Sequence, residues 1–266
     1  LELNAMDRVE ATDFLRKSLI KKDILRDEKT TNELLDELAC LPLAIAQAAA
    51  YLNMNRTSIV TYLRLLHNTE QDIVGLMSKE FRDDTRYRGT PNAIATTWVV
   101  SFSQIRERDV VAADLLSFMS CIEWKAIPHS ILPAAHSQER MESAIGILCA
   151  YSFVSKRDTD DEEGFNQSNE VKYDMHRLVH LATRIWTSQH GDVNEVKDKA
   201  LQHLARIFPG NDHTNQATWR AYMPHALRLL GDRKGLHGEN FADLGLMVGR
   251  CLLEDGRIRE AVQWIE

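Results

Sequence analysis

The spacing of apolar residues constrains this chain most, because it follows the period of an α-helix almost everywhere. In four separate stretches apolar side chains recur at i, i+3, i+4 and i+7, and each stretch predicts a helix with one buried face. These side chains are Ile59, Tyr62, Leu63 and Leu66; Ala95, Trp98, Val99 and Phe102; Ala112, Leu115, Leu116 and Met119; and Met141, Ala144, Ile145 and Leu148. The sequence therefore predicts a mainly α fold.

One region departs from the helical period. Residues 151–155 are rich in β-prone side chains, and residues 171–175 alternate apolar and polar side chains with a period of two. The segment between them is polar and acidic, which is typical of the solvated tip of a β-hairpin. Helices followed by one β-hairpin predict a winged-helix subdomain at residues 90–190.

The remaining segments are expected to be helical. Residues 1–89 are expected to form a helical subdomain, in which Thr30 and Glu33 predict a capping box for a helix over residues 32–39. Residues 191–235 predict a helical linker that includes a helix at 193–208. Residues 236–266 have the spacing of an incomplete tetratricopeptide repeat (TPR), the start of an α-solenoid, through Gly245, Val248, Gly249, Leu252, Gly256, Ala261 and Ile265. A generic helical hairpin is the alternative for this last segment.

Composition excludes several classes of protein. The 266 residues are 44% hydrophobic and 27% charged, values that are typical of a globular protein. The net charge of -7 argues against a non-specific nucleic-acid binder, and no apolar run reaches the length of a membrane span. A transcription regulator with a DNA-binding winged helix stays as a third hypothesis, although residues 138–150 set only Arg140 against Glu139 and Glu142.

The cysteines and the first residue indicate the context of the chain. Four cysteines lie far apart without a CxxC spacing, at positions 40, 121, 149 and 251. Free thiols of this kind are typical of a reducing compartment, so we expect a cytoplasmic protein. The chain begins at Leu1 rather than at a methionine, and we expect it to be a fragment.

Two residues stand out as candidates for binding. Pro42 has a rigid, apolar ring that either opens a helix or also packs on a flat base such as adenine. His176 lies at a predicted strand-to-helix junction, where free backbone N–H groups and the helix dipole favour an anion. Its ring is either a phosphate donor or a half-exposed side chain near a helix start.

Other histidines do not predict a site. His176 and His180 are spaced i, i+4, but no third ligand accompanies them, so no metal site is predicted. His225 follows Pro224 and is expected to pack at the start of a helix. The sequence has no phosphate-binding loop, no G-x-G-x-x-G and no Gly-x-Ser-x-Gly elbow. We therefore expect no catalysis on this chain, and a slow P-loop NTPase activity would belong to the parent protein.

Two motifs resemble those of the NB-ARC family of STAND-type P-loop NTPases. Leu41-Pro42-Leu43-Ala44 resembles the family's GLPLA motif, with Cys40 in place of Gly. Met175-His176 resembles the start of its MHD motif, with Arg177 in place of Asp. The resemblance implies that Pro42 contacts the adenine and His176 the β-phosphate of ADP. ADP or ATP would bind only together with an upstream nucleotide-binding domain of the same protein.

Residues 173–186 are especially similar to fungal NLR-like proteins, which join NB-ARC to TPRs. This resemblance implies signal transduction in fungal innate immunity, a protein ligand on the repeats and oligomerisation on activation. Charge and hydropathy lead us to expect no nucleic-acid or membrane partner. A helical or TPR scaffold, or an adaptor for protein–protein interaction with a degenerate nucleotide site, is the main alternative. Arg177 and the missing phosphate-binding loop favour that alternative.

Overall fold

The computed structural model describes residues 6–68, 90–157, 170–190, 193–231 and 238–265. The first unit of the chain contains α1 (Arg8–Ser18), η1 (Lys22–Leu25), α2 (Glu28–Glu37), α3 (Pro42–Asn55), a helix over residues 59–68, and α5 (Thr90–Arg108). There follow α6 (Val110–Met119), β1 (Ile127–Pro128), η2 (His129–Ile131), α7 (Gln138–Ala150), β2 (Val154–Lys156) and β3 (Lys172–Met175). The last elements are α8 (Arg177–His190), α9 (Val193–Ile207), η4 (His213–Asn215), α10 (Gln216–Gly231), α11 (Glu239–Glu254) and α12 (Ile258–Ile265).

These elements confirm a mainly helical fold with one small antiparallel sheet. They form two compact units, residues 1–110 with 146–153 and residues 111–145 with 154–266. The finer division into segments 1–89, 90–190, 191–235 and 236–266 stays a prediction. None of the helices described is long and apolar enough to cross a membrane.

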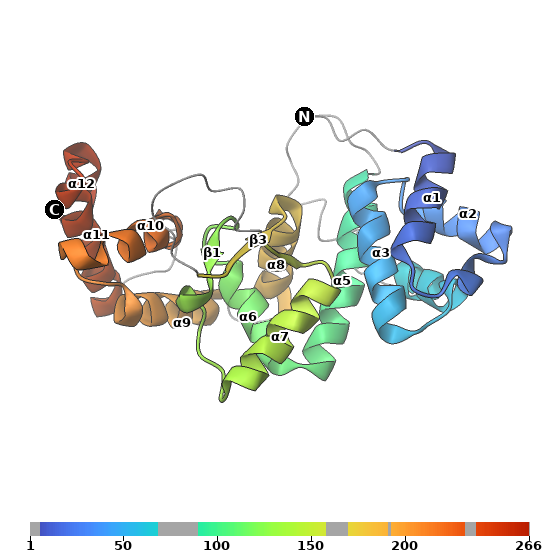
Figure 1. The fold of residues 1–266 in the computed structure, drawn as a ribbon, viewed down its shortest axis with the longest axis horizontal. Coiled ribbons are helices and arrows are strands. Elements are labelled where there is room, and N and C mark those ends of the chain that lie inside the picture. Colours follow the sequence, from blue (N-terminus) through green and yellow to red (C-terminus); the bar gives the residue numbers. More distant parts are fainter. Residues whose placement is uncertain (1–5, 69–89, 158–169, 191–192, 232–237, 266) are drawn as a thin grey trace. The chain divides into compact units, whose positions relative to one another are not determined.

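In the first unit, α3 lies between α1 and α5 (Figure 1). Ala44 and Ala48 of α3 are fully buried, and their small side chains let neighbouring helices approach closely. Gln47, a polar residue between these small side chains, is also buried, and its Nε2 donates to the carbonyl of Ser152 at 2.8 Å. The aromatic core continues with Trp98, whose ring meets that of Phe153 edge-on at 5.3 Å.

The start of α2 corrects one expectation from the sequence. The helix begins at Glu28, and the carboxylate of Asp27 caps it by accepting the N–H of Lys29 at 3.1 Å. Thr30, the expected cap, lies inside the first turn, where its hydroxyl donates to the carbonyl of Asp27 at 3.2 Å. Both side chains are good caps, but the earlier one extends the helix by a turn and adds hydrogen bonds.

The turn from α2 to α3 is a Schellman motif that places Pro42. The N–H of Ala39 donates to the carbonyl of Asp36 at 2.9 Å, and that of Cys40 to the carbonyl of Leu35 at 3.0 Å. Ala39 and Cys40 both have left-handed backbones, with φ of 49° and 51°. A glycine adopts this conformation without strain, so the structure explains why glycine would suit position 40. Pro42 then occupies the first turn of α3.

The second unit contains a three-stranded sheet in the order β1-β3-β2, with both pairings antiparallel. Val154 pairs with Met175, and Lys156 pairs with Tyr173, which confirms the predicted hairpin. The acidic tip of that hairpin lies outside the described residues. The sequence did not indicate β1, because its two residues are too few to show a period.

The C-terminal helices confirm one expectation and correct another. The helix expected over 193–208 is α9 (Val193–Ile207). Pro224, however, lies inside α10, and His225 is only 1% exposed in the middle of that helix rather than at its start. Tertiary packing holds α10 together across the proline, and no local pattern reveals this.

The helical hairpin α11–α12 turns at Gly256, which has φ of 73°. The N–H of Gly256 donates to the carbonyl of Leu253 and that of Arg257 to the carbonyl of Leu252, a second Schellman motif. Gly249 is buried on α11 and Ala261 is fully buried on α12. A hairpin is therefore present, as both hypotheses for this segment require, and its assignment to a TPR stays a prediction.

Replacing Cys40 by glycine tests the strain in the α2–α3 turn. A left-handed backbone costs a residue with a side chain about 1–2 kcal/mol, whereas glycine adds about 0.4–1 kcal/mol of entropy to the unfolded chain. We expect Cys40→Gly to raise the free energy of unfolding by about 0.5–1 kcal/mol, measured by urea denaturation. The control is Cys149→Gly inside α7, which should lower it by about 1 kcal/mol. If Cys40→Gly and Cys149→Gly lowered the free energy of unfolding equally, the left-handed backbone at Cys40 would not be strained.

Candidate functional site

The candidate site is the junction between β3 and α8 in the second unit. Two successive residues at the end of β3 are held by the connection between α6 and β1. The N–H of Met175 donates to the carbonyl of Trp124 at 2.7 Å, and a carboxylate oxygen of Asp174 accepts the N–H of Ala126 at 2.6 Å. His176 follows at once, so its backbone is fixed by the sheet on one side and by α8 on the other.

His176 caps α8 with its ring. Its Nδ1 accepts the N–H of Leu178 at 3.2 Å, while its carbonyl accepts the N–H of His180 at 2.9 Å. A neutral imidazole carries one N–H, so the proton is on Nε2 when Nδ1 accepts. The side chain is exposed, yet partial desolvation of the ring lowers its pKa from 6.5. The ring is thus neutral at pH 7, with Nε2–H as a donor to a ligand.

The charges around His176 favour an anion. Arg177, the first residue of α8, is exposed, and the first turn of the helix contains no acidic residue. The helix N-terminus already carries partial positive charge, and Arg177 adds to it. An anion next to His176 would therefore be stabilised by the helix end, by the Nε2–H donor and by Arg177.

Arg177 also contacts an aromatic ring. Its guanidinium carbon lies 6.0 Å from the ring centroid of Trp124, a cation–π distance. A positive group at this position can pair with a phosphate, pair with an acidic segment or face solvent. The structure adds the contact with Trp124, while the side chain remains accessible from outside.

His180 is a structural residue rather than a ligand. It is 2% exposed, and its Nε2 donates to the carbonyl of Ile122 at 2.9 Å. Burial lowers the pKa of His180 to about 4; the hydrogen bond to Ile122 opposes this, and the nearby Arg228 and Arg184 add to it. Across the described ranges no cluster of three or more His, Cys, Asp or Glu side chains could hold a metal ion.

Pro42 belongs to the first unit and His176 to the second, so the structure describes each in its own surroundings. Pro42 is half-buried at the start of α3, next to the buried Leu41. Its ring keeps a partly open face at a rigid turn, which is compatible with packing against a flat group and equally with a helix start.

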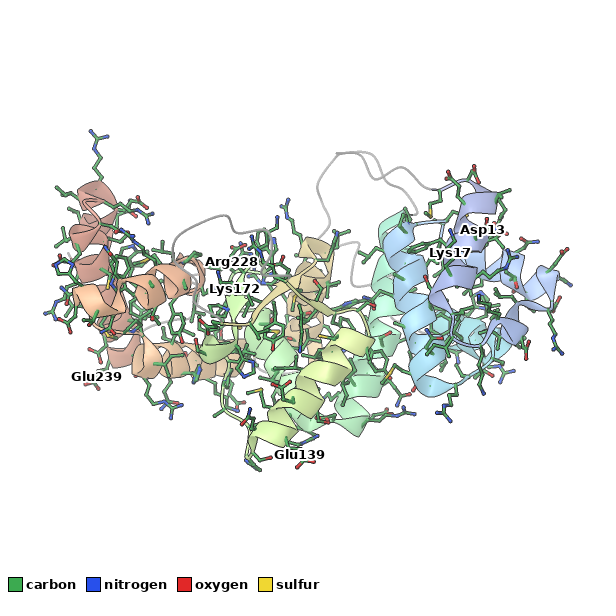
Figure 2. The ribbon with its side chains drawn as sticks, viewed as in Figure 1. Asp13, Lys17, Glu139, Lys172, Arg228 and Glu239 are labelled. Carbon is green, nitrogen blue, oxygen red and sulfur yellow. The ribbon has the colours of Figure 1, made fainter. Side chains whose placement is uncertain are left out.

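Sequence reasoning missed Trp124 and Arg228. The guanidinium carbon of Arg228, on α10, lies 4.8 Å from the ring centroid of Trp124; Figure 2 labels Arg228 and also Lys172 of β3. The one available signal was an isolated tryptophan between Glu123 and Lys125, in a segment without helical period. Arg228 gave no signal, because its role depends on a contact across more than 100 residues of sequence.

Comparison with known proteins gives one informative relative. No family model matches the chain. Over 256 residues the chain is 35% identical to a nucleotide-binding leucine-rich repeat (NLR)-like protein of Hyaloscypha variabilis (strain UAMH 11265 / GT02V1 / F). The match covers 94% of this chain but 25% of that protein, so the chain spans about a quarter of the relative's length. The chain is therefore similar to one region of an NLR-like protein.

Two substitutions of His176 test its capping role. His176→Ala leaves the N–H of Leu178 without its acceptor, and we expect the free energy of unfolding to fall by about 1 kcal/mol. Asparagine is a good cap, so His176→Asn should retain most of the stability. Urea denaturation of both variants at pH 7 measures the difference. Equal stability of the two variants would show that the ring nitrogen does not cap α8.

The pKa of His180 makes stability depend on pH. The folded state binds its proton at about pH 4 and the unfolded state at about 6.5, so between these values the unfolded state holds more protons. The contribution of His180 to the free energy of unfolding is fully present above pH 6.5 and is lost as the pH falls towards 4. His225, also with a pKa of about 4, contributes in the same direction.

We expect His180→Gln, whose amide can still donate to Ile122, to flatten this dependence. The measurement is the urea midpoint at pH 7 and at pH 5 for the variant and the wild type. The loss of stability on acidification should be smaller in the variant. An identical loss in both proteins would contradict a buried, neutral His180.

Proposed function

We propose that this chain is the regulatory half of an NB-ARC nucleotide switch in a cytoplasmic, NLR-like signalling protein. In its closed state the switch holds ADP, whose phosphates are bound mainly by an upstream nucleotide-binding domain of the same protein. Pro42 packs on the adenine, and His176 donates its Nε2–H to the β-phosphate. The chain itself carries out no catalysis.

The observation that carries this proposal is the geometry of His176. Its Nδ1 is occupied by the N–H of Leu178, so its remaining donor is directed away from that bond at the positive end of α8. Arg177 strengthens the preference of this site for an anion. The order of α7, β2 and β3 supports a winged-helix context for the histidine, and the nucleotide-binding NLR-like name of the relative supports the class of ligand.

Signalling follows from a difference in affinity between two packed arrangements. ADP binds the closed arrangement better, and its loss in favour of ATP shifts the population towards the open one. The α11–α12 hairpin would begin the TPR sensor that binds a protein ligand, and oligomerisation would follow activation. Arg177 replaces the family's acidic residue, so the closed state lacks that carboxylate and relies on His176.

ADP binding to the parent protein, which includes the upstream domain, tests the proposal. We expect His176→Ala to weaken ADP binding about tenfold or more, since one charge-assisted hydrogen bond contributes about 1.5–3 kcal/mol. His176→Asn should weaken it similarly while keeping the cap, because its side chain is too short to place a donor at the position of Nε2. The affinity is measured by isothermal titration calorimetry.

The control is His213→Ala, an exposed histidine on η4, which should leave ADP affinity unchanged. If both His176 variants bound ADP with unchanged affinity, His176 would have no role in nucleotide binding. If His176→Ala weakened ADP binding and His176→Asn did not, the effect would come from the lost cap of α8 rather than from a phosphate contact.

The second candidate is a non-catalytic scaffold or adaptor with a degenerate nucleotide site. Four apolar side chains between 38% and 63% exposed on the last two helices favour it: Leu246, Leu253, Ile258 and Val262. Leu246 and Leu253 share one face of α11, and Ile258 and Val262 share one face of α12, so each pair offers an apolar stripe to a protein partner. A parent protein that binds neither ADP nor ATP would leave this candidate in place of the switch.

A further inference from the structure

Residues 122–126, which connect α6 to β1, are held on one side by the elements that flank His176. Trp124 accepts from Met175, and Ala126 donates to Asp174. Ile122 accepts from the buried His180, one turn into α8. Three hydrogen bonds therefore tie this short connection to the strand before His176 and to the helix after it.

The same residues are held on their other side by α10. The buried His225 approaches the carbonyl of Ala126 with its Nε2 at 3.3 Å. One turn further along α10, Arg228 places its guanidinium carbon 4.8 Å from the centroid of the Trp124 ring. Any displacement of α10 must therefore move residues 122–126 or break these contacts.

The indole of Trp124 is the point where the two sides meet. Its ring lies within cation–π distance of Arg177, from α8, and of Arg228, from α10. The ring of His180 lies 5.6 Å away and is tilted against it. Both guanidinium groups use the same electron-rich ring, so a change in the position of one alters the environment of the other.

We propose that Trp124 is a positioning residue that couples α10 to His176. When Arg228 rests on Trp124, residues 122–126 hold Met175 and Asp174 in place, and Arg177 and the His176 ring keep the geometry described above. When α10 moves away, this support is lost and His176 turns from its cap. The coupling is a structural property of this chain, and its meaning for signalling rests on the proposed role of His176.

Arg228→Met in the 266-residue chain, without nucleotide, tests the coupling. Methionine keeps an apolar stem of similar reach but removes the cation. We expect the ¹⁵N chemical shifts of the His176 ring and the amide proton shift of Leu178 to change, as Nδ1 loses part of its role as an acceptor. Arg228→Lys, which keeps the cation, should stay close to the wild type.

The chain offers a matched control on the same helix. Arg220 also rests on a tryptophan, 5.6 Å from the ring centroid of Trp219, but has no contact with residues 122–126 among its described interactions. Arg220→Met should leave the His176 and Leu178 signals unchanged. Trp124→Phe keeps a smaller aromatic ring and should give shifts between those of the wild type and of Arg228→Met.

Unchanged His176 signals in a folded Arg228→Met variant would overturn the coupling. Equal shifts in Arg228→Lys and Arg228→Met would also overturn it, because they would assign the effect to packing rather than to the cation–ring contact. Neither result depends on nucleotide. If the parent protein does not bind ADP, the proposed switch is wrong but the coupling of α10 to His176 is unaffected. If the His176 shifts do not change in Arg228→Met, the coupling is wrong but the proposed switch is unaffected.

Discussion

The position of His176 depends on the hydrogen bonds between β3 and residues 122–126. These bonds satisfy backbone groups of a connection that has no regular structure of its own, and groups left without partners there would cost free energy. They also fix two successive residues just before the histidine. With the sheet holding one side and α8 the other, the His176 ring meets the N–H of Leu178 and one tautomer is selected.

Each candidate residue has a nearby or hydrogen-bonded neighbour, other than glycine, whose backbone is left-handed. Cys40 lies two positions before Pro42, and Ala126, with φ of 52°, bonds the side chain of Asp174 two positions before His176. Each such residue costs about 1–3 kcal/mol and persists only where its surroundings require it. At position 40 the strained backbone turns the chain into the helix that presents Pro42, and at position 126 it places the N–H that bonds Asp174.

Several basic side chains lie around Trp124 and His180, although the chain as a whole is acidic. The net charge is -7, yet three arginines lie around Trp124 and His180, from α8 and α10. Surface charges more than about 10 Å apart are largely screened at moderate salt, so the nearest groups decide what binds. A chain with a net negative charge can therefore have a locally basic region, and the two arginines that lower the pKa of His180 help to keep this buried ring neutral.

The helices with strong apolar stripes, the hairpin of β2 and β3, and the junction at which His176 lies could be predicted from the sequence, because the spacing of apolar residues that marks each element is local. Even a local feature was predicted wrongly at the start of α2, where two possible caps lie close together and Asp27 rather than Thr30 caps the helix. Three further features follow from contacts between distant segments: α10 continues through Pro224, β1 pairs with β3, and the Trp124 ring contacts Arg177 and Arg228. A single sequence does not indicate contacts between residues about 50 to 100 positions apart, because such contacts produce no periodic pattern. Each partner alone is an ordinary arginine, tryptophan or two-residue strand.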